Sequence, residues 1–199
     1  MTLLHDHRSN AQMLMMCDTN GHFTGQYIRR DLAHAGEGRR HLAVALLLYN
    51  RAGELLLQRR KHHLFDDVWD ITGATHPLRL ADGTDESLER AAMRCLDHEY
   101  GIDGPPLMEV GSFSYFARDR DGLHCENEHC TLFVGELNDP VEVNPDVGYG
   151  CQWVGETFLL RDVNLSPERY APWALLSISL LFEAGFFQRS LTPQTPWRT

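Results

Sequence analysis

Runs of apolar residues divide the chain into short strands joined by turns. The nearly continuous apolar run over residues 41–50 predicts a buried strand, and a turn at Asn50–Gly53 leads into a returning strand over 54–60. A short apolar run followed by Asn20-Gly21 predicts a hairpin near the N-terminus. The same criteria predict further strands over residues 108–117, 126–134 and 151–154.

Two other stretches have the pattern of helices. Between Glu86 and Tyr100, apolar residues recur at helical spacing, and Gly101 follows as a stop signal. Residues 171–187 predict a long apolar helix with Pro172 in its first turn. The segment Tyr27–Ala35 fits either a short helix or a loop. Strands that flank one helix, followed by a long C-terminal helix, predict an α/β fold, an α/β/α sandwich around a mixed sheet.

Composition limits the domain organisation and the partners. With 199 residues, 43% of them hydrophobic, we expect a disordered leader over residues 1–11, a single domain over 12–188 and a tail over 189–199. The net charge of −10 argues against a nucleic-acid partner. No apolar run approaches the roughly 20 residues of a membrane span. Five cysteines without a CxxC motif are typical of a reduced, cytoplasmic protein, and both a monomer and a homodimer remain open.

The densest positive cluster, Arg59-Arg60-Lys61, lies at the end of the returning strand. One interpretation is a solvated strand end, and the other is a clamp that binds an anion. We favour the clamp because the rest of the chain is acidic and because guanidinium groups bind phosphate oxygens in pairs.

Histidine and glutamate residues suggest a metal site. Glu126 and Glu128 lie two residues apart on a strand, so their carboxylates share a face and repel each other unless a cation lies between them. With His34, His41 and His76 they make a plausible ligand set for Mn²⁺, Zn²⁺ or Mg²⁺. A solvated strand face and unrelated surface or core histidines are the alternatives, and spacing alone does not bring the five residues together.

The segment from Leu80 to Ile102 resembles a degenerate Nudix box, G-x5-E-x7-R-E-U-x-E-E-x-G-U, where U is a bulky apolar residue. Leu80 replaces the first glycine, and the matching residues are Glu86, Arg94, Leu96, Glu99, Gly101 and Ile102. Cys95 and His98 replace two carboxylates that hydrolases of this superfamily use to bind metals, which counts against ordinary hydrolysis. Glu99 either extends from the helix end into solvent or points inward near a metal.

The rest of the chain resembles the type I isopentenyl diphosphate isomerases, over about residues 12–175. The similar segments are His41-Leu42-Ala43, the run from Leu48 to Arg60, Asp67-Val68-Trp69, Thr75-His76-Pro77-Leu78, Tyr115, Glu126-Asn127-Glu128 and Ala171-Pro172-Trp173. They occur in the same order and with similar spacing. The resemblance implies a Nudix-like fold and a metal-dependent active site.

The resemblance also implies which residues bind metal and phosphate. The three histidines with Glu126 and Glu128 would hold one divalent metal. Glu86 would help to hold a Mg²⁺ ion that binds the substrate diphosphate. The Arg59-Arg60-Lys61 cluster would bind the phosphates directly, because paired guanidinium groups suit their geometry.

The implied chemistry is proton transfer at an alkene. Glu128 and Tyr115, beside Glu126, would act at one face of the alkene, and the ring of Trp173 would stabilise a carbocation. The family has a catalytic cysteine on the opposite face, and here Ala74 stands at its position. A methyl group transfers no proton, so simple isomerase activity should be very weak or absent.

The leading hypothesis is therefore a metal-dependent enzyme that protonates a C=C bond of a prenyl diphosphate. The small residues of Gly73-Ala74-Thr75 would leave room for a longer prenyl chain. The outcome would be isomerisation with another base, or proton-initiated cyclisation or rearrangement of a C10 or C15 substrate in terpenoid biosynthesis. The alternatives are a Nudix-type diphosphate hydrolase and a non-catalytic prenyl-diphosphate binder.

Overall fold

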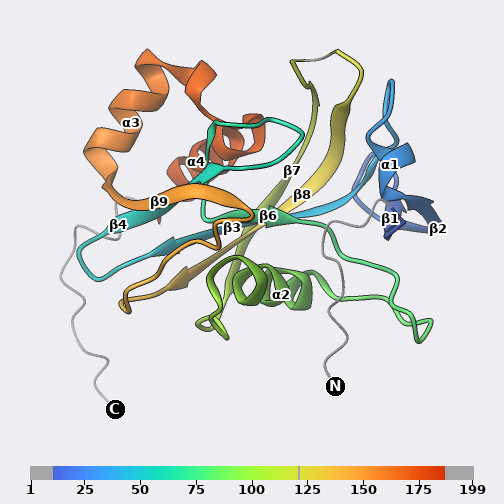
Figure 1. Ribbon diagram of the computed structural model, residues 1–199, viewed down its shortest axis with the longest axis horizontal. Helices are drawn as coiled ribbons and strands as arrows, with labels where there is room; N and C mark the ends of the chain where they lie inside the picture. The colour runs from blue at the N-terminus through green and yellow to red at the C-terminus, as the bar shows by residue number, and fades with distance from the viewer. Residues whose placement is uncertain (1–10, 121, 187–199) are drawn as a thin grey trace.

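The computed structural model describes residues 11–120 and 122–186 (Figure 1). Its strands are β1 (Met13–Cys17), β2 (Phe23–Arg29), β3 (His41–Tyr49), β4 (Glu54–Arg60), β5 (Trp69–Asp70), β6 (Gly73–Thr75), β7 (Met108–Arg118), β8 (Cys125–Glu136) and β9 (Gly148–Gly155). Its helices are α1 (Arg30–Ala33), α2 (Leu88–Tyr100), α3 (Glu156–Leu165), the 3-10 turn η1 (Pro167–Arg169) and α4 (Pro172–Glu183). Apart from residue 11, the predicted leader (1–11) and tail (189–199) lie outside the described residues.

The apolar strand β3 is the centre of a mixed sheet. It pairs in parallel with β8 along its whole length, from His41 beside Glu128 to Tyr49 beside Glu136. On its other side it pairs antiparallel with the short strand β6, with Ala45 beside Ala74. β4 continues the sheet towards β9 and β5, and β7 pairs with β8. The strand predictions over 41–50, 54–60 and 126–134 are therefore confirmed as central elements.

Both faces of the sheet are covered by helices (Figure 1). Alternate residues of β3 point to opposite faces, so its unbroken apolar run supplies two cores. Ala43, Ala45 and Leu47 belong to the core that contains residues of α4, whereas Val44 and Leu46 pack in the core with α2. The predicted α/β fold with a mixed sheet is confirmed, and its layers are an α/β/α sandwich.

Several elements differ from their predicted bounds. The segment expected to be a helix or a loop over 27–35 is divided between the end of β2 and the single turn α1. The helix α2 begins at Leu88, where the Ser87 side chain accepts a hydrogen bond from the Arg90 amide. Helix α3 was not predicted, because among its residues only Leu159 is buried and the amphipathic pattern is weak.

The described part of the C-terminal helix, α4, begins at Pro172 as expected and is apolar on most sides. Within the described residues, none of the helices combines the length and apolar character that crossing a membrane requires.

Candidate functional site

Five side chains from four separate segments converge beside the end of the central sheet. His34 follows α1, His41 is the first residue of β3, His76 follows β6, and Glu126 and Glu128 lie on β8. Their candidate ligand atoms all lie within 4.8 Å of one another, and all five residues are buried. The parallel register places His41 directly beside Glu128. Spacing alone did not predict this convergence, because it depends on how β3, β6 and β8 pair.

Hydrogen bonds to the backbone fix the tautomers of two histidines. His34 Nδ1 donates to the Arg30 carbonyl oxygen at 2.7 Å, and His41 Nδ1 donates to the Arg39 carbonyl oxygen at 2.6 Å. In its neutral form each ring therefore keeps a lone pair on Nε2, which faces the cluster. Burial lowers the pKa of His34, but the Glu126 carboxylate outweighs it and raises that pKa overall. Metal-bound histidines are commonly oriented by such a bond to the other ring nitrogen.

The electrostatics of the cluster fit a divalent cation. Burial raises the pKa of Glu126 and lowers the pKa of His76 to about 3, so the His76 imidazole is neutral near pH 7. Hydrogen bonds with His41 and His76 outweigh burial and hold the pKa of Glu128 well below its usual range. His34 Nε2 lies 2.9 Å from Glu126 Oε2, and His41 Nε2 lies 3.4 Å from Glu128 Oε1, so electron pairs of neutral imidazoles face carboxylate oxygens across the cluster. Three imidazole nitrogens and two carboxylates are a donor set that suits Mn²⁺, Zn²⁺ or Mg²⁺.

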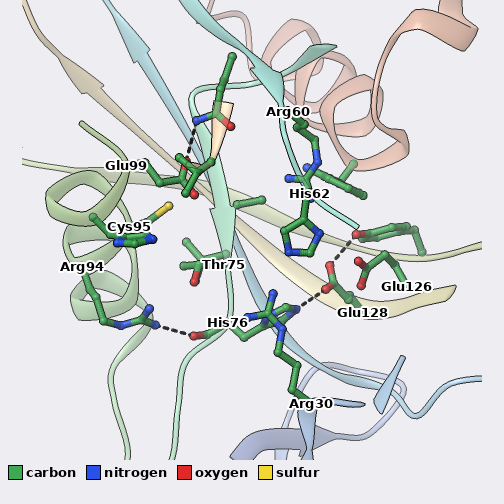
Figure 2. Close-up of a pocket in the computed structure, with 17 residues that line it drawn as sticks. Arg30, Arg60, His62, Thr75, His76, Arg94, Cys95, Glu99, Glu126 and Glu128 are labelled. Atoms are coloured by element: carbon green, nitrogen blue, oxygen red, sulfur yellow. Dashed lines mark hydrogen bonds and ion pairs between the residues drawn. The ribbon is translucent and has the colours of Figure 1, made fainter. Parts of the chain in front are cut away.

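A pocket opens directly beside this cluster (Figure 2). Its wall includes Glu126, Glu128, Tyr115, Trp173 and Ala74. The Tyr115 hydroxyl donates to Glu128 Oε2 at 2.6 Å, and His76 Nε2 lies 2.8 Å from Glu128 Oε1. Burial raises the pKa of Tyr115 well above its ordinary value. Glu128 therefore contacts both the histidine cluster and the Tyr115 hydroxyl, and it lines the pocket.

Only one residue of the basic cluster reaches the pocket. Arg60 lines it, and among the described residues Arg60 Nε donates no hydrogen bond. Arg59 and Lys61 were expected to bind phosphate, but the structure places both outside the pocket. Arg59 is half-exposed and pairs with Asp67 at 2.6 Å, and Lys61 Nζ donates to the Pro145 carbonyl oxygen. Side chains alternate along β4, which sends Arg59 and Arg60 to opposite faces, and Lys61 lies beyond the end of the strand.

Glu86, the magnesium ligand that the resemblance implies, lies two residues before helix α2 and outside the pocket wall. Both carboxylate oxygens of Glu86 accept hydrogen bonds from Arg94 at 2.8 Å, and one also accepts from the Leu78 amide. Glu86 is buried by these contacts and is not among the residues of the pocket wall. Glu99 is the glutamate of α2 that lines the pocket, so the inward interpretation of Glu99 is the one that the structure supports.

Glu99 and Cys95 lie on the helix side of β6, and Glu126 and Glu128 lie on its other side (Figure 2). Burial raises the pKa of Glu99 to about 7, against a hydrogen bond from Gln58 Nε2 at 2.8 Å. Glycine at position 73 permits this approach. A Cβ there would lie 2.9 Å from Cys95 Sγ and 3.2 Å from Glu99 Oε2.

Four further basic residues of the pocket wall were not among the predicted site residues: Arg30, His62, Arg94 and His98. Arg94 matched the box arginine, but its second contact, a 2.8 Å hydrogen bond to the His76 carbonyl oxygen, depends on the tertiary structure. Arg30 precedes His34 by one helical turn. This spacing could have identified Arg30 as a neighbour of His34 if α1 had been predicted to be a helix. His62 follows the basic cluster by one residue and gave no signal of its own.

Position 74 offers only a methyl group to the pocket. Ile71, three residues before it, is fully buried in the apolar core that includes Trp173. The loop that carries His76 thus contributes a possible metal ligand but, at position 74, no group that transfers a proton.

Similarity to known proteins agrees with this architecture. The NUDIX domain model matches residues 39–174. The isopentenyl-diphosphate Delta-isomerase of Citrobacter koseri is 30% identical over 172 residues, which cover 85% of this chain and 91% of that protein. The isopentenyl-diphosphate Delta-isomerase of Brevibacterium linens is 30% identical over 165 residues, which cover 81% of this chain and 87% of that protein.

Solved structures agree on the fold. The DR0079 protein of Deinococcus radiodurans has a TM-score of 0.60 at 19% identity and covers 90% of this chain and 99% of its own. A MutT NUDIX hydrolase of Burkholderia pseudomallei has a TM-score of 0.55 at 16% identity and covers 72% of this chain and 98% of its own. The chain therefore belongs to the NUDIX family and, within it, to the isopentenyl-diphosphate isomerase family, of which it is a divergent member with alanine at position 74.

Proposed function

We propose that this chain is a metal-dependent enzyme that acts on a prenyl diphosphate by protonating a C=C bond. The observation that carries the proposal is the hydrogen bond from Tyr115 to Glu128 on the pocket wall, beside the His34, His41 and His76 cluster. It places a proton donor next to a buried carboxylate in a pocket that Trp173 also lines. The names of the 30% identical relatives support the prenyl diphosphate as substrate class.

Two metal sites follow from this proposal. The three histidines with Glu126 and Glu128 would hold one divalent ion, which neutralises the two carboxylates and makes a proton held between Glu128 and Tyr115 more acidic. Glu99, in place of Glu86, would bind the Mg²⁺ ion that accompanies a diphosphate, because its carboxylate faces the pocket.

The remaining wall residues suit the two ends of the substrate. Arg60 has a free Nε–H for a phosphate oxygen, and Arg30 adds a second cation to the same wall. Trp173 offers an aromatic ring whose electron-rich face attracts a cation. Protonation by Glu128 or Tyr115 would form a tertiary carbocation beside that ring. Loss of a proton would end the reaction, either directly or after attack by a second C=C bond has closed a ring and moved the cation to a new carbon.

The absence of a thiol at position 74 favours attack by a second C=C bond, and so cyclisation or rearrangement, over direct loss of a proton. Without that acid–base group, removal of a proton on the opposite face is slow, so the cation survives long enough to rearrange. The alanine also leaves space beside Trp173 for a longer chain. We therefore propose a C10 or C15 substrate and a cyclised or rearranged product, with isomerisation through another base as the lesser outcome.

Turnover in deuterated water tests the proposed function. The purified protein is incubated with Mg²⁺ and isopentenyl, geranyl or farnesyl diphosphate, and the prenyl products are examined by mass spectrometry. Deuterium bound to carbon in a product is expected, since solvent supplies the proton on Glu128 or Tyr115. If no product from any of the three substrates carries deuterium, the proposal fails.

Diphosphate hydrolysis is the second candidate, favoured by the NUDIX match over residues 39–174. Against it, Cys95 and His98 stand at two box carboxylate positions, and Glu86 is held by Arg94. Release of inorganic phosphate without any deuterated product would assign the chain to this class. Binding of a prenyl diphosphate without either reaction would assign it to non-catalytic binders.

A further inference from the structure

Asp70 is a fully buried carboxylate that the proposed chemistry does not yet use. It lies on the two-residue strand β5, and its side chain is 0% exposed. Burying a charged carboxylate lowers the stability of the fold unless specific partners compensate the charge. The partners of Asp70 therefore indicate its role. Both of its partners line the substrate pocket, although Asp70 itself does not.

Each oxygen of Asp70 holds one of these partners. Oδ1 accepts a 2.8 Å hydrogen bond from the indole Nε1 of Trp173. Oδ2 accepts a 2.9 Å hydrogen bond from Nη1 of Arg60. The neighbouring residue of β5, Trp69, accepts a hydrogen bond through its carbonyl oxygen from the Ala171 amide at 2.8 Å. The same short strand thus fixes the start of α4 and the ring that α4 carries.

The position of the Arg60 guanidinium raises an electrostatic problem. Its central carbon lies 4.8 Å from the centre of the Trp173 ring, over the aromatic face. A carbocation beside that ring would meet a like charge, and like charges repel strongly where water is excluded. Burial raises the pKa of Asp70, and its contacts with Arg60 and the indole N–H oppose that rise. The ionised carboxylate, 2.9 Å from Arg60 Nη1, cancels the charge of the guanidinium.

We propose that Asp70 is a positioning residue that orients Trp173 and Arg60 through its two oxygens and neutralises the guanidinium, so that the Trp173 ring can stabilise a carbocation. The inference rests on the proposed function. In this arrangement Asp70 sets the distance between Arg60, at the diphosphate end of the substrate site, and Trp173, at the hydrocarbon end.

Asp70→Asn tests the proposal, because the amide keeps the shape and can still accept from the indole N–H, but removes the charge. With Mg²⁺ and the active prenyl diphosphate, we expect kcat to fall by about tenfold or more, with KM unchanged or lower. Affinity for inorganic pyrophosphate, measured by calorimetry, should be unchanged or higher, because Arg60 is left as an uncompensated cation. A purely structural role would weaken pyrophosphate binding together with kcat.

Asp67→Asn is the matched control. It removes the carboxylate partner of the neighbouring Arg59, in a half-exposed pair outside the pocket, and should leave kcat and KM unchanged. If Asp70→Asn does not fold, Arg60→Gln/Asp70→Asn carries the test, since it leaves no unpaired buried charge. For the double variant we expect a higher KM, because Arg60 contacts the diphosphate, and a loss in kcat of less than about tenfold, because no cation is left over the ring.

The inference is overturned if Asp70→Asn leaves kcat unchanged, if kcat and pyrophosphate affinity fall together, or if the double variant loses about tenfold or more in kcat. These results would leave the proposed function intact as long as the wild-type protein forms a deuterated product. Failure of the wild-type protein to do so would remove the proposed function, and the inference with it.

Discussion

At the scale of single residues, Ala74 distinguishes this chain most clearly from the isomerases it resembles. The pocket retains Tyr115 bonded to Glu128 on one part of its wall, whereas position 74 supplies a methyl group. Under the proposed function, Tyr115 and Glu128 supply one acid–base group and position 74 supplies no counterpart, so this residue would determine which reactions can be completed.

Restoring the missing group gives the first prediction. Ala74→Cys should create or raise isopentenyl diphosphate isomerase activity by about tenfold or more, because a thiol can transfer the second proton. Ala74→Ser is the control, since it has similar size but a hydroxyl too weakly acidic to replace a thiol. Formation of dimethylallyl diphosphate is the measurement, and equal rates for wild type, Ala74→Cys and Ala74→Ser would contradict the prediction.

Glu99 gives a prediction about pH. Burial raises its pKa from 4.5 to about 7, so the folded protein holds this proton more tightly than the unfolded chain does. Its contribution to stability is complete below the unfolded pKa and is lost as pH rises through about 7. In urea unfolding with a chelator present, the free energy of unfolding of wild type should fall over this window relative to Glu99→Gln. Parallel pH profiles for the two proteins would contradict it.

At the scale of elements, strands and helices were predictable where their buried residues form a long apolar pattern in the sequence. The strands β3, β4 and β8 and the helix α2 were predicted because their apolar periodicity extends over seven or more residues. The strands β5 and β6 have two and three residues, too few to show any period. Both carry residues of functional interest, Asp70 and Ala74, so a local pattern alone does not place them.

Site residues were predicted where the type of residue was enough to suggest its role, and they were missed where the role depends on the direction in which the side chain points. The five histidine and glutamate residues were chosen correctly as a group that the fold brings together. Alternation along β4 shows that Arg59 cannot share a face with Arg60, but only the sheet pairing identifies the inner face. Arg94 forms a salt bridge with Glu86, the magnesium ligand that the resemblance implies, and the sequence pattern gave no sign of this tertiary contact.

The connection between α2 and the His76 loop leads to a prediction about stability. Arg94 binds both oxygens of Glu86 and the carbonyl oxygen of His76, so Arg94→Met would leave a buried carboxylate without its partner. We expect a loss of roughly 3 kcal/mol or more in the free energy of unfolding. Arg59→Met breaks an exposed pair and should cost about 1 kcal/mol or less. Equal losses in urea titrations would contradict the assignment.

At the scale of the whole molecule, the metal cluster joins segments that are distant in the sequence. His34 and Glu126 come from opposite halves of the chain and meet only when β3 and β8 pair. Buried carboxylates that lack a cation repel each other, so a metal bound at this cluster should stabilise the entire domain.

Removal of metal should therefore lower the midpoint of thermal unfolding. At a free metal concentration about one hundred times the Kd, binding contributes about 2.7 kcal/mol, which a chelator should abolish and added Mn²⁺ or Zn²⁺ should restore. Glu126→Gln should reduce this metal-dependent shift, whereas the surface variant Glu37→Gln should retain it. A midpoint that does not respond to chelator or metal would count against the cluster as a metal site.

The most direct test of the central claim compares carbon-bound deuterium in the products of wild type and Glu128→Gln. Both proteins are incubated with Mg²⁺ and geranyl diphosphate in deuterated water, and the prenyl products are analysed by mass spectrometry and nuclear magnetic resonance. The account predicts deuterium at an alkene-derived carbon with wild type and a loss of about one hundredfold or more in its rate of incorporation with Glu128→Gln. Wild-type products without deuterium, or undiminished labelling by Glu128→Gln, would contradict it.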